Sequence, residues 1–157
     1  MKPNEIAEAL DFLRELAANN HKPWMDENRD RYKLHRGRFE RWVEHLADRI
    51  SEFDPSVAGL KAKECTYRMN RDIRFSADKS PYKTHFSAFI APRGKNSGLA
   101  GYYIHLEPVV EGSSMIGHSI LAAGQVCIPP AILRSIREEI VDNGDLMAEH
   151  IASADGF

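Results

Sequence analysis

Two stretches of helical periodicity open the chain. The first covers residues 4–18, where apolar side chains recur every three or four positions: Ile6, Leu10, Leu13 and Leu16. Charged residues fill the positions between them, so the pattern predicts an amphipathic helix. The same spacing predicts a second, longer helix from Pro23 to about Phe53, because proline suits the first turn of a helix. The Asp54-Pro55 pair is expected to end it.

Beyond Ala62 the apolar pattern shortens towards the period of two that is typical of strands. Strands are predicted over four ranges: residues 64–71, 84–91, 100–106 and 115–121. A further helix is predicted after Pro129-Pro130, with a break at Asn143-Gly144 and a short helix over residues 145–152. This order predicts an α+β fold in one domain, residues 1–157. Its antiparallel sheet of four or more strands would be packed by two N-terminal helices and a later C-terminal helix.

The composition predicts a soluble, cytoplasmic protein with no membrane partner. No apolar run approaches the roughly 20 residues of a membrane span, and the N-terminus lacks the apolar core of a signal peptide. The two cysteines, Cys65 and Cys127, are too few for a disulfide framework or a cysteine zinc site. Both are expected to be reduced.

Positive charge gathers in one window of the sequence. Residues 61–95 carry nine Lys and Arg against three Asp and Glu. The preceding 60 residues carry ten against twelve, and residues 96–157 carry two against eight. This asymmetry indicates either an anionic partner or charge pairing with the acidic C-terminal part.

Within this window, residues 67–84 interleave cations with hydroxyls and tyrosines. Such donors hold phosphate and carboxylate groups, and the turn-forming Asp78-Lys79-Ser80-Pro81 can gather them around one point. We predict a pocket for an anionic small ligand, a phosphorylated molecule or nucleotide, formed by Arg68, Arg71, Arg74, Ser76, Lys79, Tyr82 and Lys83. Asp72 and Asp78 are the candidate catalytic groups. The sequence names no cofactor and leaves open whether the protein is an enzyme.

Two other interpretations of this segment remain open. In the first, the same arginines and aspartates form an ion-pair network that fixes a long loop, since such networks mimic binding sites. In the second, the segment is part of a basic surface, extended by the cations of the long helix, that docks a protein or nucleic acid without catalysis. A concave site would favour a small ligand, and a flat or convex basic face would favour docking.

One residue of the long helix is a further candidate for the pocket. Trp24, Asn28 and Tyr32 are four residues apart and share one helical stripe. Asn28 is unexpected on a stripe that faces a core, so it is predicted either to make a buried hydrogen bond or to border the pocket.

Metal and nucleophile chemistry receive little support from the sequence. His85, His105 and His118 lie in predicted strands near acidic residues such as Glu107, but no ligand spacing recurs, and no metal site is predicted. No serine or cysteine lies in a nucleophile elbow, and the glycines match neither a P-loop nor a dinucleotide fingerprint.

Three blocks of sequence together resemble a known family. The first runs from Phe12-Leu13 to Asn19-Asn20-His21-Lys22-Pro23-Trp24, followed by Asn28 and Tyr32. The second is Arg68 to Thr84, and the third is Gly101-Tyr102-Tyr103-Ile104-His105-Leu106 with Ala122-Ala123-Gly124. The chain is identified by these blocks as a member of the conserved hypothetical family of domain of unknown function 2461. The resemblance implies no particular activity. Members usually continue beyond the point where this chain ends, so the C-terminal part of the fold is expected to be shortened.

Overall fold

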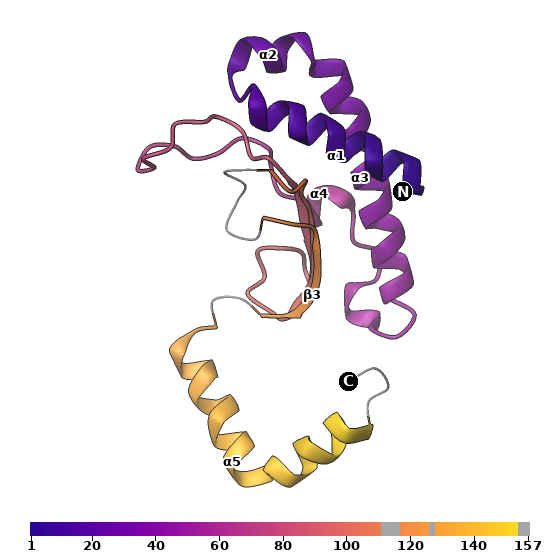
Figure 1. Ribbon diagram of the computed structural model, residues 1–157. Coiled ribbons are helices and arrows are strands. Elements are labelled where there is room, and N and C mark those ends of the chain that lie inside the picture. Colours follow the sequence, from indigo (N-terminus) through magenta and orange to yellow (C-terminus); the bar gives the residue numbers. More distant parts are fainter. Residues whose placement is uncertain (111–116, 126–127, 154–157) are drawn as a thin grey trace. The chain divides into compact units, whose positions relative to one another are not determined.

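The computed structural model describes residues 1–110, 117–125 and 128–153 (Figure 1). By its internal contacts the chain divides into two compact units, Met1–Gly124 and Gln125–Phe157. The single domain expected from chain length therefore stays a prediction.

Three helices begin the first unit: α1 (Pro3–Ala18), α2 (Lys22–Glu27) and α3 (Arg29–Ile50). The predicted long helix is thus divided at Asn28, whose φ of −101° and ψ of 15° are not helical. Its side-chain amide and its backbone N–H both donate to the Trp24 carbonyl, each at 3.0 Å, and so close the end of α2. The other helix boundaries follow the sequence closely. After α3, a short 3-10 turn, η1 (Pro55–Val57), is capped by the Asp54 side chain.

Three antiparallel strands form the sheet: β1 (Phe86–Ile90), β2 (Gly101–Leu106) and β3 (Ile120–Gly124), in that spatial order. Phe86 pairs with Leu106 and His105 with Ile120. The prediction of four or more strands is wrong, because the segment at residues 64–71 forms no strand. Part of the predicted strand at residues 115–121 lies outside the described residues, and β3 begins five positions later.

In place of the start of the strand predicted over residues 64–71, the structure has a short helix, α4 (Ala62–Cys65). The residues after it pair through two isolated bridges, Thr66 with Ala88 of β1 and Asn70 with Tyr82 ahead of β1. Pro81 has no N–H group to donate to the ladder at the second bridge. The carbonyl of Tyr67 is taken by the Arg36 guanidinium at 2.7 Å. This segment has the alternating pattern of a strand, but its backbone N–H and C=O groups bond to partners outside a sheet ladder.

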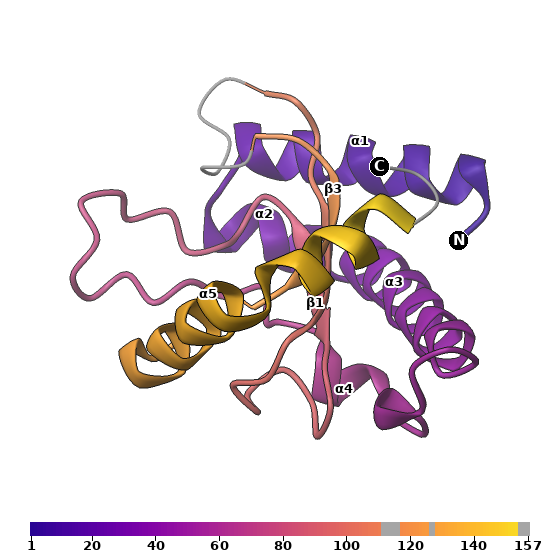
Figure 2. The same cartoon turned by 90° about the horizontal axis from the view of Figure 1, so that it is seen from below.

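The core of the first unit lies between the helices and one face of the sheet. Alternation along β1 directs Phe86, Ala88 and Ile90 towards the helices, where all three are buried. Phe39 of α3 stacks on Phe86 with ring centroids 5.5 Å apart. Figure 2 shows the same elements from below. The side chains between these positions, such as Ser87, therefore belong to the opposite face of the sheet.

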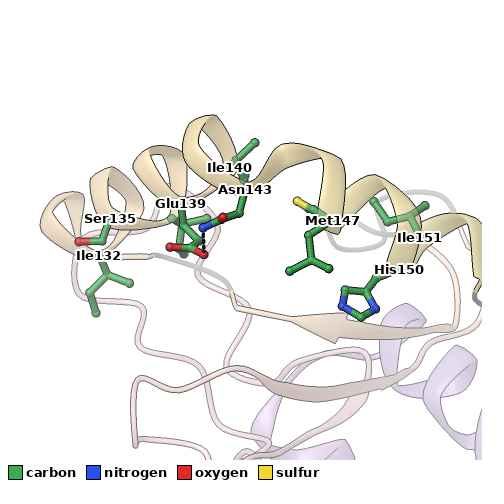
Figure 3. Close-up of a pocket in the computed structure, with 10 residues that line it drawn as sticks. Ile132, Ser135, Glu139, Ile140, Asn143, Met147, His150 and Ile151 are labelled. Carbon is green, nitrogen blue, oxygen red and sulfur yellow. Dashed lines mark hydrogen bonds between the residues drawn. The ribbon is translucent and has the colours of Figure 1, made fainter.

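The second unit contains one helix, α5 (Pro130–Ser153), with a kink at Asn143 where the sequence predicts a break. Figure 3 shows the apolar side chains that line a groove along this helix, including Ile132, Ile140, Met147 and Ile151. Helical spacing places them on one side. That α5 packs against the sheet stays a prediction. Among the described residues, no helix combines the length and the apolar character needed to cross a membrane.

Candidate functional site

The segment from Arg68 to Thr84 forms a long loop that projects beyond the sheet (Figures 1 and 2). At its base, the N–H of Arg71 donates to the Pro81 carbonyl at 2.9 Å, and the N–H of Lys83 donates to the Met69 carbonyl at 2.8 Å. These two bonds close the loop. The base is thus fixed by backbone pairing, and the tip must be held by side chains.

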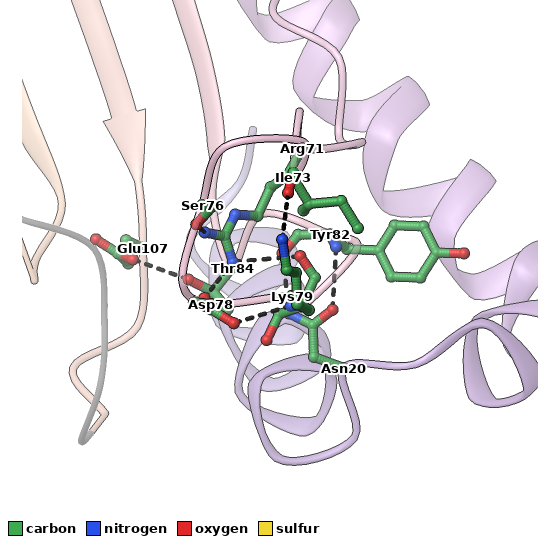
Figure 4. Close-up of polar contacts among 10 residues, drawn as sticks. Asn20, Arg71, Ile73, Ser76, Asp78, Lys79, Tyr82, Thr84 and Glu107 are labelled. Atoms are coloured by element: carbon green, nitrogen blue, oxygen red, sulfur yellow. Dashed lines mark hydrogen bonds and ion pairs between the residues drawn. The ribbon is translucent and has the colours of Figure 1, made fainter.

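Arg71 organises the interior of this loop (Figure 4). Its guanidinium pairs with Asp78 and donates to the Ser80 carbonyl at 3.2 Å and to the Ser76 hydroxyl at 3.3 Å. The hydrogen bonds from Ser80 are the largest influence on Asp78, and with Arg71 they lower the pKa of its carboxyl to about 2. Arg71, Ser76 and Asp78 are therefore brought together, and their polar groups bond to one another.

The remaining charges of the loop tip also have internal partners. Arg74 binds Asp72 in a bidentate pair, with N–O distances of 2.9 and 2.6 Å, and this pair is exposed. The Arg74 hydrogen bonds hold the pKa of the Asp72 carboxyl below its usual value. Lys79 donates to the Ile73 carbonyl at 3.0 Å. The contacts of Arg71 and Arg74 match the ion-pair network interpretation, and Lys79 bonds to a carbonyl of the same loop. The binding role of all three stays a prediction.

Two candidate cations at the base of the loop behave differently. Arg68 is exposed and Lys83 is partly buried, and neither forms an ion pair with a carboxylate in the described part of the chain. The Lys83 ammonium lies 5.5 Å from the centroid of the Tyr67 ring. Burial lowers the pKa of Lys83, and the positive charges of Arg68 and Arg36 lower it further. We call Arg36, Tyr67, Arg68 and Lys83 the Lys83 cluster.

The two uncharged candidates have structural partners. Tyr82 is buried in the hydrophobic core, and both of its backbone polar groups bond to the Asn20 side chain (Figure 4). Asn28 lies at the α2–α3 junction, where its side chain contacts Trp24 and Arg31. The Asn28 side chain thus makes a part-buried hydrogen bond, and its role at the border of a pocket stays a prediction.

A second group of chemically competent side chains lies on the sheet face away from the helices. His105 of β2 shares this face with Tyr103, whose hydroxyl is 2.8 Å from His105 Nδ1. His105 Nε2 is 3.0 Å from Glu107 Oε2, and Glu107 Oε1 accepts from the Thr84 hydroxyl at 3.1 Å. The rings of His85 and His105 are 4.2 Å apart between centroids. We call His85, His105 and Glu107 the His–Glu cluster.

Comparison with known proteins places this sequence in a family. The pattern of DUF2461, described as a conserved hypothetical protein, matches residues 8–156. The chain belongs to the DUF2461 family. No curated protein and no solved structure matches the chain. The family resemblance found in the sequence is thereby confirmed, and the family description supplies no activity.

In this DUF2461 member, the His–Glu cluster is nearly sealed from solvent. The side chains of His105 and Glu107 are 1% and 0% exposed, and that of His85 is 15% exposed. Burial is the main reason that the pKa of His85 falls to about 4, with contributions from His105 and Lys83 that outweigh the opposing charge of Glu107. His85 is therefore neutral at physiological pH, with a nitrogen lone pair available.

Sequence reasoning noted these three residues in the DUF2461 chain but did not group them. His105 and Glu107 are two positions apart, so alternation alone places both on one face if the extended backbone continues past Leu106. The pairing of Phe86 with Leu106 then brings His85 opposite Glu107. A His-x-Glu run in a strand was the available signal. That run does not reveal the register between β1 and β2, which brings His85 to the other two residues.

Proposed function

We propose that this protein binds a small ligand carrying a phosphate or carboxylate group, and that the Lys83 cluster is the anchor for that group. The proposal keeps the anionic ligand predicted from the sequence. It narrows the binding cations to Arg68 and Lys83, because Arg71, Arg74 and Lys79 already bond within their own loop. No reaction is assigned to the site.

The observation that carries the proposal is the Lys83 ammonium, which pairs with no carboxylate in the described part of the chain. A partly buried ammonium is costly unless an opposite charge lies near it. Here the nearest charged influences on Lys83, Arg68 and Arg36, are both cations. Active sites commonly combine burial with like charges, and both shift the pKa values of their residues. An anion at this position would bond to the free donors and relieve the repulsion.

Arg36 is the member of the Lys83 cluster whose position is fixed by hydrogen bonds. Its guanidinium is largely buried and donates to the Thr66 hydroxyl and the Tyr67 carbonyl, both at 2.7 Å. It also pairs with Glu40, so its charge is partly balanced. This leaves Arg68 and Lys83 as the cations with donors available for direct contact with a ligand. Tyr67 supplies an apolar wall beside Lys83.

The test measures thermal unfolding of the purified protein with inorganic phosphate, citrate and a panel of nucleotides and sugar phosphates at low salt. An anion at 100 times its dissociation constant adds about 2.7 kcal/mol, and each kcal/mol raises the midpoint by roughly 2–4 °C at this size. We expect the shift to disappear in Lys83→Gln and Arg68→Gln. It should persist in Lys79→Gln, the matched control whose ammonium bonds to a loop carbonyl.

The unfolding temperatures of the variants without ligand provide an independent test. If the Lys83 cluster is built for a ligand, Lys83→Gln removes repulsion and should unfold at the same temperature as the wild type or above it. An ion-pair scaffold would instead lose stability. A ligand shift that survives in both Lys83→Gln and Arg68→Gln would exclude the proposal.

The non-catalytic docking function retains one supporting observation. Phe75, at the loop tip, is 96% exposed, and the Arg74 guanidinium lies 5.9 Å from the centroid of its ring. An exposed aromatic beside an arginine is common where proteins meet partners. A short oligonucleotide that binds with a steep loss of affinity in salt, through Arg74 and Phe75 rather than Lys83, would favour docking over the small-ligand pocket.

A further inference from the structure

The three side chains of the His–Glu cluster present their donor atoms to one small region. One ligand atom from each of His85, His105 and Glu107 can be chosen so that all three lie within 4.8 Å of one another. His105 Nε2 is 3.0 Å from Glu107 Oε2, and His85 Nδ1 is 3.9 Å from Glu107 Oε1. Two donors of a tetrahedral zinc ion, each at about 2.1 Å, are roughly 3.4 Å apart. The observed separations lie on either side of that value.

From this geometry we propose that His85, His105 and Glu107 bind one divalent transition-metal ion. Two imidazole nitrogens and one carboxylate are a donor set suited to Zn²⁺, Fe²⁺ and neighbouring ions. The hard ions Mg²⁺ and Ca²⁺ prefer oxygen donors, and this set supplies them from only one residue. The metal site goes beyond the anion site at the Lys83 cluster and stands on separate observations.

The strongest of these observations is an unpartnered nitrogen. His85 Nδ1 is buried and forms no hydrogen bond, a property that it shares with only one other side-chain nitrogen in the described part of the chain. A buried polar atom without a partner is costly, and each such atom needs an explanation. A metal ion between His85 Nδ1 and the Glu107 carboxylate would supply the missing partner.

The surroundings of the cluster orient its ligands as the outer groups of metal sites do. A metal-bound histidine usually donates its second ring N–H to a neighbouring oxygen. The Tyr103 hydroxyl lies 2.8 Å from His105 Nδ1 and can take this role. The Thr84 hydroxyl donates to Glu107 Oε1 at 3.1 Å and holds the carboxylate in place. Bound metal would replace the proton between His105 Nε2 and Glu107 Oε2.

The charges around the site also affect the ion. Lys83 lies close enough to act electrostatically on His85 and disfavours a bare cation there. The single carboxylate neutralises only part of a divalent charge. Three protein ligands leave at least one coordination position open. An anion in that position would experience the positive charge of Lys83, which acts on His85. The metal site and the Lys83 cluster are therefore compatible neighbours, although each can exist without the other.

The test uses the metal alone as the probe. Protein stripped with a chelator is titrated with Zn²⁺ by calorimetry and with Co²⁺ by absorption spectroscopy, because tetrahedral Co²⁺ has a characteristic visible spectrum. We expect one ion per chain, a raised thermal midpoint with Zn²⁺, and a Co²⁺ spectrum that shows nitrogen and oxygen ligands. His85→Gln and Glu107→Gln should lose all three signals. His45→Gln, at an exposed histidine of α3, should keep them.

A conservative variant protects the test against loss of folding. Tyr103→Phe removes only the hydroxyl beside His105 and should weaken Zn²⁺ binding on the order of tenfold, as loss of an outer hydrogen bond does. If folded wild-type protein shows no Zn²⁺ or Co²⁺ binding, the metal site does not exist. Binding that is unchanged in His85→Gln would also overturn it. Anion binding at the Lys83 cluster is measured separately in metal-free protein, so the two proposals can fail independently.

Discussion

The side chain of Asn20 pairs with the backbone of Tyr82 as a neighbouring strand would. Its amide nitrogen donates to the Tyr82 carbonyl at 2.9 Å, and its amide oxygen accepts from the Tyr82 N–H at 3.1 Å (Figure 4). Asn20 lies between α1 and α2, and Tyr82 lies 62 positions further along, at the base of the long loop. A single side chain thus joins the helical layer to the loop that contains the candidate anion site.

Asn20→Ala should destabilise the protein by about 1–3 kcal/mol, because it leaves two partly buried backbone groups of Tyr82 without partners. Asn20→Asp keeps the acceptor but loses the donor, and it sets a carboxylate against the Tyr82 carbonyl. It should therefore also destabilise. Urea denaturation measures both effects. Asn19→Ala removes one exposed hydrogen bond to Glu15 and is the matched control, with a smaller loss expected. Equal losses at both positions would contradict the special role of Asn20.

The Asp78 carboxyl should make the loop sensitive to acid. Its pKa of about 2 in the folded protein lies below the roughly 3.9 of an unfolded chain. The stabilisation is therefore fully present above about pH 4 and is lost as pH falls towards 2. The urea midpoints of wild type and Asp78→Asn should differ at neutral pH and converge as pH falls through this window. A difference that stays constant down to pH 2 would show that Asp78 acts by hydrogen bonding alone.

The guanidinium of Arg36 connects α3 to the segment after α4, and substitution by lysine tests whether its planar shape is essential. Lysine at this position keeps the charge but cannot reach Glu40, Thr66 and the Tyr67 carbonyl together. We expect Arg36→Lys to cost about 2 kcal/mol, the scale of a hydrogen bond that involves a charged group. Chemical denaturation gives the value. Arg41→Lys, at an exposed position of the same helix, should change stability by less than about 0.5 kcal/mol.

Two glycines should respond to alanine in opposite directions. A Cβ at Gly101 would collide with the Ile90 carbonyl and lie 2.7 Å from Ala91 Cβ, so Gly101→Ala should destabilise by about 1–3 kcal/mol. A Cβ at Gly37 in α3 would meet nothing closer than the flexible Arg41 side chain at 3.5 Å. Gly37→Ala should therefore stabilise by about 1 kcal/mol through helix propensity. Thermal melts of both variants decide this, and the same sign for both would contradict it.

Sequence patterning anticipated the elements whose stability is local. The amphipathic spacing around Leu13 located α1, and the Asn143-Gly144 pair located the kink of α5. The strand predicted over residues 64–71 failed because it depended on partners elsewhere. The capping of α4, the missing N–H of Pro81 and the guanidinium of Arg36 together diverted its backbone hydrogen bonds.

At the candidate site too, local features could be predicted from the sequence and long-range contacts could not. Composition and charge located the basic segment between Arg68 and Lys83, and turn chemistry indicated that it is a loop. Which cations remain available could not be read from the sequence, since Arg71 and Lys79 look no different from Lys83 until their partners are known.

The sequence by itself determined the family, the helices α1, α3 and α5, the strands β1 and β2, and the basic segment, because periodicity, turn chemistry and charge are properties of neighbouring residues. Only the tertiary structure decided that His85 lies beside His105 and Glu107, and that Lys83 forms no ion pair within residues 1–110, 117–125 and 128–153. These residues are brought together by strand register and by competition among hydrogen-bond partners. Both depend on contacts between segments far apart in the chain, and one residue of slip in the register would turn the histidines to the other face of the sheet.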